Sequence, residues 1–147
     1  MLKRIAIAIA WCAMSAAIMR AQTMTIDDGA CHLSVPADWK STPTLHMAEA
    51  PGPGVFRALV KTINAEHYTR TMNLVKSGQM TALNPKILDE NGKRVLIQTE
   101  MKVGKKTTTH YQLMTKGSSA CQGIVDFDDP AMAERARKIV ESTTGAK

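Results

Sequence analysis

The chain has 147 residues and a formal net charge of +6. This is the length of one ordinary domain, and a composition of 44% hydrophobic and 22% charged residues excludes extensive disorder. Only 4% of the residues are aromatic, so the chain offers few of the stacking side chains that bind single-stranded nucleic acids. We therefore expect one domain with an aliphatic core and no nucleic-acid partner.

Residues 1–21 have the pattern of a secretory signal peptide. Lys3 and Arg4 supply a positive start, and residues 5–18 form an apolar run without a charged side chain. The run is shorter than the roughly 20 residues that a membrane-spanning helix needs, and no second apolar run follows it. The pattern predicts export of the chain and no membrane span in the mature form.

The cleavage site stays open between Ala21 and Ala17, so we take residues 22–147 as the mature domain. Cys12 suggests acylation, but the bulky Trp11 precedes it where a small residue is the norm, and we treat Cys12 as part of the removed segment. Cleavage leaves 16 basic against 13 acidic side chains, a net charge of +3. We expect a mildly basic periplasmic or extracellular protein.

Two cysteines, Cys31 and Cys121, remain in the mature chain. Compartments outside the cytoplasm oxidise thiols, so we predict a disulfide between them. Loop entropy assigns a crosslink over such a separation about 4 to 5 kcal/mol of stabilisation. A reactive thiol or a metal ligand is the alternative, although neither cysteine has a second cysteine at a metal-binding spacing.

The mature chain opens with two predicted short strands in residues 24–40, joined by a turn at Asp28-Gly29. Pro36 lacks an amide hydrogen and ends the second strand, and Trp39 is expected to cover the edge of the core. Alternation in the second strand places three apolar side chains on one face: Cys31, Leu33 and Val35.

Further strands and a helix are expected next. A short strand crosses residues 45–49 within a segment rich in proline and glycine, and alternation over residues 55–63 predicts a strand that buries Phe56, Ala58 and Val60. Asn64 is a helix N-cap, because its side-chain oxygen can accept from the first free amides. A stripe at helical spacing extends that helix to about residue 79: Tyr68, Met72, Val75 and Gln79.

The second half of the chain predicts a three-stranded meander. Asn84-Pro85 indicates extended or turning backbone, and Asn91-Gly92 a tight turn. Strands follow over residues 94–103, 107–115 and 119–127. One face of the first strand carries Val95, Ile97, Met101 and Val103, and one face of the last carries Cys121, Val125 and Phe127.

A last helix is predicted from Asp129-Pro130 to the end of the chain, with Gly145 as its stop. Its apolar stripe consists of Met132, Ala136, Ile139 and Val140. The expected fold class is therefore α+β: an antiparallel sheet with a C-terminal meander, flanked by a central helix and a C-terminal helix.

Three short motifs accompany this order of elements: LSVPADW at residues 33–39, NGKR at 91–94 and DDP at 128–130. Because of these motifs and the order of elements, the chain resembles the PsbP-like, or Mog-like, fold over nearly all of its mature length. The resemblance implies an α/β/α sandwich. Members of that family look like accessory or interaction modules rather than enzymes, so the resemblance implies a binding role for this chain. It supplies no site residue.

Catalytic and metal-binding motifs do not emerge from the sequence. Asp126, Asp128 and Asp129 lack the glycine and distal glutamate of a calcium loop, and capping explains them. We find no nucleophile elbow, phosphate-binding loop or zinc-binding helix, and expect no cofactor and no metal. The four histidines are scattered over different predicted elements: His32, His46, His67 and His110.

Two functions remain from these observations. The first is an exported binding or accessory module without a catalytic site. The alternative is a small secreted hydrolase or metal-handling protein that uses His110, His67 or the carboxylates around Asp128, because catalytic groups need only meet in space.

Positive charge is concentrated in one stretch whose only acidic residue is Glu100. Such residues either protect hairpin tips and sheet edges from aggregation or form a patch for an anionic partner. That partner would be an anionic envelope polymer, lipid headgroups or an acidic protein face. Six residues form the candidate patch: Lys93, Arg94, Lys102, Lys105, Lys106 and Lys116.

Overall fold

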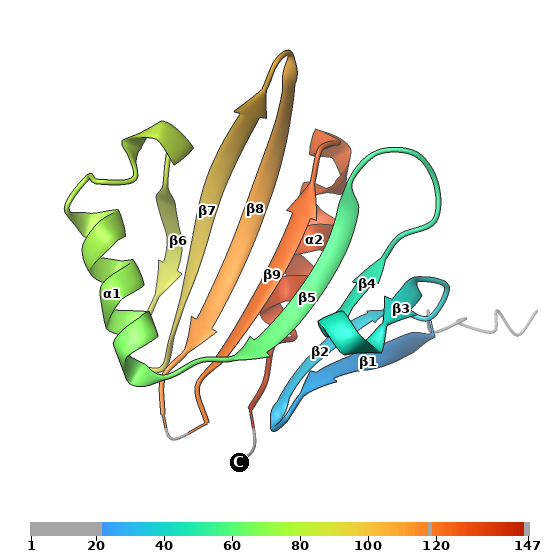
Figure 1. Cartoon of the computed structure of the whole chain (residues 1–147), viewed down its shortest axis with the longest axis horizontal. Coiled ribbons are helices and arrows are strands. Elements are labelled where there is room, and N and C mark those ends of the chain that lie inside the picture. The colour runs from blue at the N-terminus through green and yellow to red at the C-terminus, as the bar shows by residue number, and fades with distance from the viewer. Residues whose placement is uncertain (1–21, 118, 146–147) are drawn as a thin grey trace, which may run out of the picture.

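A seven-stranded antiparallel sheet dominates the computed structural model, which describes residues 22–117 and 119–145 (Figure 1). The strand order is β3-β4-β5-β9-β8-β7-β6, and a separate hairpin is formed by β1 (Thr23–Asp28) and β2 (Cys31–Pro36). The strands of the sheet are β3 (Lys40–Thr42), β4 (Met47–Glu49), β5 (Phe56–Thr62), β6 (Lys86–Glu90), β7 (Arg94–Val103), β8 (Lys106–Thr115) and β9 (Cys121–Phe127).

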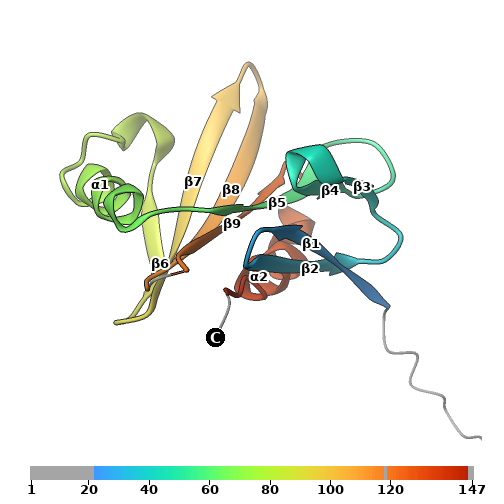
Figure 2. The ribbon, with the colours of Figure 1, turned by 60° about the horizontal axis from the view of Figure 1, so that its bottom comes forward.

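The helices α1 (Ala65–Lys76) and α2 (Ala133–Glu141) pack on opposite faces of the sheet (Figure 2). The alternation along β7 shows this, because Val95 and Ile97 belong to the cluster under α1, whereas Leu96 between them belongs to the core shared with α2. The α+β fold with a meander and two helices is confirmed. Neither helix of the described segments combines the length and the apolar character needed to cross a bilayer.

The main core lies between the sheet, the β1–β2 hairpin and α2. Its fully buried side chains include the three predicted for β2, together with Ala58, Val60, Leu113, Val125 and Val140. Burial of each large aliphatic side chain contributes about 1.5 to 3 kcal/mol. Trp39 packs edge-to-face on Phe56 with 4.7 Å between ring centroids, so it covers the core edge as expected.

A smaller core lies under α1, where Tyr68 and Met72 meet Val95, Ile97 and Met114. The backbone of α2 packs closely on β8 and β9, whereas the backbone of α1 stands farther from the strands. The two helices therefore cover the sheet unequally.

The start of α1 agrees with the sequence, but its end does not. The Asn64 side chain accepts a hydrogen bond from the His67 amide at 2.7 Å, as a cap should. The helix ends at Lys76, so Gln79 is not part of its stripe. Gly78 has a φ of +75°, a left-handed conformation that suits glycine at a helix end.

The C-terminal helix is also shorter than predicted. A 3₁₀ turn, Pro130–Met132, follows the Asp129 cap, and α2 ends at Glu141 rather than near the chain end. Beyond it, Thr144 exchanges two backbone hydrogen bonds with His32 of β2. This pairing joins Thr144 to β2, so the chain has left the helix by this residue.

The two edge strands of the sheet, β3 and β6, were not predicted from the sequence. The pairing of β6 with β7 contains a register shift between Ile87 and Asp89. The predicted β7 face also differs along its length. Val95 and Ile97 are buried under α1, but Met101 is 46% and Val103 70% exposed, because they lie beyond that cover.

Candidate functional site

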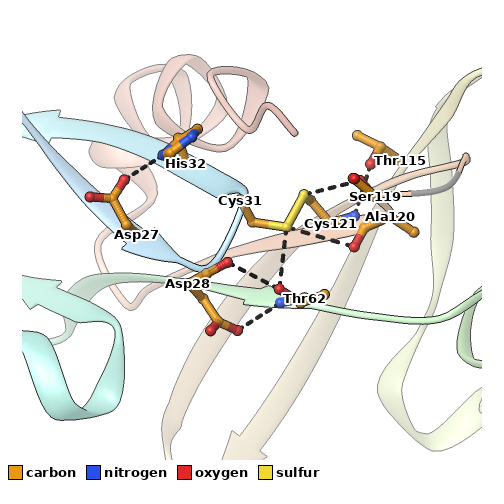
Figure 3. The surroundings of a disulfide bond; sticks show 9 residues. All are labelled: Asp27, Asp28, Cys31, His32, Thr62, Thr115, Ser119, Ala120 and Cys121. Carbon is orange, nitrogen blue, oxygen red and sulfur yellow. Dashed lines mark hydrogen bonds and ion pairs between the residues drawn. A yellow bond between two sulfur atoms is a disulfide. The ribbon is translucent and has the colours of Figure 1, made fainter. Parts of the chain in front are cut away.

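The predicted disulfide is present. Cys31 and Cys121 are bonded, their Cα atoms lie 5.6 Å apart, and neither side chain is exposed (Figure 3). In this state neither sulfur is available as a free thiol or as a metal ligand. Beside the bond, the Thr62 amide and hydroxyl donate to the Asp28 carboxylate and carbonyl at 2.7 and 3.0 Å. The surroundings are those of a structural crosslink.

The six basic residues of the candidate patch fall into two groups at opposite ends of the β7–β8 hairpin. Each strand has ten residues, so the two ends are about 30 Å apart. Arg94 pairs with Asp89 at 3.5 Å. Lys102, Lys105 and Lys106 lie around the hairpin turn, and Lys93, Arg94 and Lys116 lie at the other end.

The histidines also lie on separate elements. His32 pairs with Asp27 on the hairpin, His46 bonds the Asp27 carbonyl at 2.7 Å, and His67 lies on α1. Within the described ranges, no group of three or more His, Cys, Asp or Glu side chains could hold a metal ion. His110, on β8, instead pairs with Asp126 of β9.

The sheet face on the α1 side is only partly covered. Figure 1 looks onto this face, and no helix crosses in front of β5, β9 and β8. We call this uncovered area the open face and define it by the alternate side chains of the three strands. Strand pairing sets five polar side chains in one row across it: Thr99, His110, Asp126, Arg57 and Glu49.

Asp126 is the centre of this row. Its side chain is only 5% exposed, and it accepts hydrogen bonds from Arg57 Nε, at 2.9 Å, and from His110 Nδ1. Burial alone would raise the pKa of Asp126, but the hydrogen bonds from His110 and Arg57 outweigh it and lower the pKa. The carboxylate is therefore ionised and oriented by a neighbour on each adjacent strand.

Arg57 connects this buried carboxylate to solvent. Its side chain is 46% exposed, and among the described residues its two terminal amino groups have no carboxylate partner. Half-buried Leu59 and Ile124 lie beside Gln112 in the next row of the open face. The arrangement presents a fixed guanidinium beside apolar surface.

The His110–Asp126 pair has the orienting geometry of an acid–histidine dyad. Asp126 binds Nδ1, while Nε2 is buried and has no hydrogen-bond partner in the described part of the chain. A hydrolytic triad also needs a nucleophile beside Nε2. The polar row contains no serine or cysteine, and its one hydroxyl, that of Thr99 across from His110, forms no hydrogen bond with Nε2 in this structure.

No local sequence pattern indicates that Arg57, His110 and Asp126 meet in the fold. Arg57 and His110 lie on the polar faces of their strands, and the capping role expected for Asp126 is wrong, because Asp126 binds Arg57 and His110 while Asp129 caps the helix start. One signal does point to Asp126, because it interrupts an otherwise apolar strand end, Ile124 to Phe127.

The chain matches no protein-family model and no curated protein. A crystal structure from Pseudomonas aeruginosa, of a protein of unknown function described as a candidate regulator, is similar to it with a TM-score of 0.48. The two are 15% identical, over 85% of this chain and 97% of that one.

Proposed function

We propose that this chain is an exported binding or accessory module without a catalytic role, and that an acidic face of a partner protein docks on the open face around Arg57. The observation that carries this proposal is the contact by which the buried Asp126 holds the Arg57 side chain in place. Only Asp126 of this pair is buried, and the guanidinium that it orients reaches solvent, where a partner can bind it.

Arg57 has the properties of an interface anchor. Arginine is enriched among residues that dominate binding energy, and its free amino groups can donate to a carboxylate in a bidentate manner. Exposed Lys61 and Lys106 lie on the same face, and Glu49 at its margin is the exposed acid of the polar row. The excess of cations favours an acidic protein surface over a basic one.

The apolar side chains of the open face support a protein partner. Leu59 and Ile124 are half-buried beside the polar row, and the more exposed Met101 and Val103 extend the apolar surface along β7. A fixed arginine next to a row that contains apolar side chains is the kind of residue that is enriched in protein interfaces.

Export and the PsbP-like sandwich are part of this proposal. The signal-peptide residues, 1–21, lie outside the described part of the chain. A buried disulfide suits a chain that folds in an oxidising compartment, which supports export to the periplasm or beyond. The order of elements, with one helix on each sheet face, supports the PsbP-like arrangement.

Site-directed photocrosslinking in native cells tests the proposal. A photoreactive amino acid at Leu59 should capture one reproducible partner with an acidic surface, and Arg57→Glu in the same chain should abolish that product. The matched control places the photoreactive group at Lys138, exposed on α2 on the other side of the sheet. Equal capture from both positions, or capture that survives Arg57→Glu, would contradict the proposal.

The alternative, a small secreted hydrolase or metal-handling protein, is favoured by the His110–Asp126 pair alone. Metal analysis of the purified mature protein and a broad hydrolase substrate panel discriminate between the two functions. Turnover that is lost in His110→Ala, or a stoichiometric metal, would replace the binding-module proposal.

A further inference from the structure

A cavity of about 350 Å³ lies between α1 and the connection from β8 to β9. Its walls include Tyr68 and Met72 of α1 and Ala120 next to β9, and Lys116, Lys76 and Glu90 contribute charged groups to its lining. This volume lies within the range of small-molecule sites. The cavity is separate from the Arg57–Asp126–His110 row, whose residues do not line it.

The cavity follows from the position of α1. The helix backbone stands away from the strands, and small side chains, Ala65 on α1 and Ala120 opposite, leave space that larger residues would fill. The cavity is open to solvent, so a ligand can enter it from outside without unfolding of α1.

Tyr68 gives the cavity an unsatisfied polar group. The residue is 7% exposed, and its hydroxyl is buried without a hydrogen-bond partner among the described residues. A buried hydroxyl without a partner is costly, and most such groups find one. The hydroxyl is shielded from solvent in this structure, so a ligand oxygen in the cavity would accept this hydrogen bond once the Tyr68 side chain turns towards it.

Lys116 adds a positive charge at the same place. Its Nζ lies 4.9 Å from the centroid of the Tyr68 ring, and it forms no ion pair with any described carboxylate. By contrast, Lys76 is already paired with Glu90 at 3.0 Å. An ammonium and a hydroxyl from residues that line one cavity, together with the side chain of Met72, match an anionic group attached to an apolar body.

We propose that this cavity binds a small amphipathic monocarboxylate, with its carboxylate on Lys116 Nζ and the Tyr68 hydroxyl and its apolar body against Met72 and Ala120. The chemical class follows from the two donors and the apolar walls. This site does not depend on the open face, so it can hold whether or not the proposed partner binds there.

Titration of the mature protein with decanoate, followed by amide chemical shifts, tests the proposal. Decanoate should bind saturably at or below about 1 mM, with the largest shifts along α1 and around Lys116. Acetate has the charge without the chain, and decanol has the chain without the charge, so both should bind at least about ten-fold more weakly. Absence of saturation with decanoate, or equal binding of decanol, would overturn the proposal.

Variants then locate the site. Lys116→Met should weaken decanoate binding about ten-fold, and Tyr68→Phe, which removes only the hydroxyl, a few-fold. The matched control is Lys105→Met at the opposite end of the same hairpin, which should leave the affinity unchanged. Equal weakening by Lys105→Met would show non-specific attraction and refute the site. If a variant fails to fold, the comparison of decanoate with decanol on the unaltered protein still decides.

Discussion

Cys31 is the first residue of β2 and Cys121 the first residue of β9, so their disulfide joins two strands that belong to separate sheets. In the described structure, β2 pairs beyond its own hairpin only with Thr144, after α2. The hairpin is otherwise held to the main sheet by side-chain packing, the Asp28–Thr62 hydrogen bonds, the hydrogen bond between His46 and the Asp27 carbonyl, and this covalent bond.

Removal of the crosslink should therefore destabilise the protein strongly. We expect Cys31→Ala with Cys121→Ala to lower the free energy of unfolding by about 3 to 5 kcal/mol, measured by urea denaturation, since the closed loop spans 90 residues. Thr62→Val, which removes the neighbouring side-chain hydrogen bond but keeps the crosslink, should cost about 1 kcal/mol. Free thiols in protein folded under oxidising conditions, seen by intact mass before and after reduction, would contradict the bond.

Asp126 should make stability depend on pH in the acid range. Because its pKa is lower in the folded state, the ionised carboxylate stabilises the protein above the ordinary aspartate pKa of about 3.9, and this contribution is lost as the pH falls through the lowered value. Asp126→Asn should thus cost about 1 to 3 kcal/mol at pH 7, and the difference from the unaltered protein should shrink towards pH 2. Urea midpoints at several pH values measure it.

Asp38→Asn is the matched control for that experiment, because Asp38 is an exposed aspartate. It should leave the urea midpoint unchanged at each pH. A constant difference between Asp126→Asn and the unaltered protein from pH 7 to pH 2 would show that the carboxylate charge does not stabilise the fold.

Elements whose signals are local could be predicted from the sequence. The turn at Asp28-Gly29 and the caps at Asn64 and Asp129 depend on residues within a few positions of one another, and the structure contains all three. The strand β6 is different, because the segment 86–90 is short and most of its residues are charged. It forms a strand only through its pairing with the long β7.

The candidate site could not be predicted in the same way. Arg57 and Asp126 are 69 positions apart in the chain, and they meet because β5 and β9 pair in one particular register. A shift of one residue would turn every side chain of a strand to the other face, and the sequence around Arg57 alone does not determine that register. The disulfide was predictable over a similar separation, because the predicted removal of residues 1–21 leaves only two cysteines to pair.

The cap of α1 gives a prediction about a single hydrogen bond. Asn64→Ala removes the acceptor of the His67 amide, so it should lower stability by about 1 kcal/mol and speed hydrogen exchange of that amide. Asn73→Ala, in the exposed interior of the same helix, should be neutral or slightly stabilising, since alanine is the better helix former there. Equal effects of the two substitutions would show that Asn64 contributes no capping.

Gly123 lies in β9 directly under the end of α2, and a methyl group there would come within 2.0 Å of Thr143 Oγ1 and 3.1 Å of its Cβ. Thr143 has little freedom to move, because it is 5% exposed and its hydroxyl donates to the Val140 carbonyl at 2.6 Å. Gly123→Ala should therefore destabilise the protein by about 1 to 3 kcal/mol in urea denaturation. Gly92→Ala, in open space, should cost little.

A double-mutant cycle separates this clash from a general effect of alanine in a strand. Thr143→Ala removes the nearest atom but leaves Cβ, so it should restore part of the stability lost in Gly123→Ala while costing some stability of its own. The two substitutions should then be less harmful together than the sum of their separate effects. Strict additivity would mean that β9 and the end of α2 are not in the close contact that requires glycine at position 123.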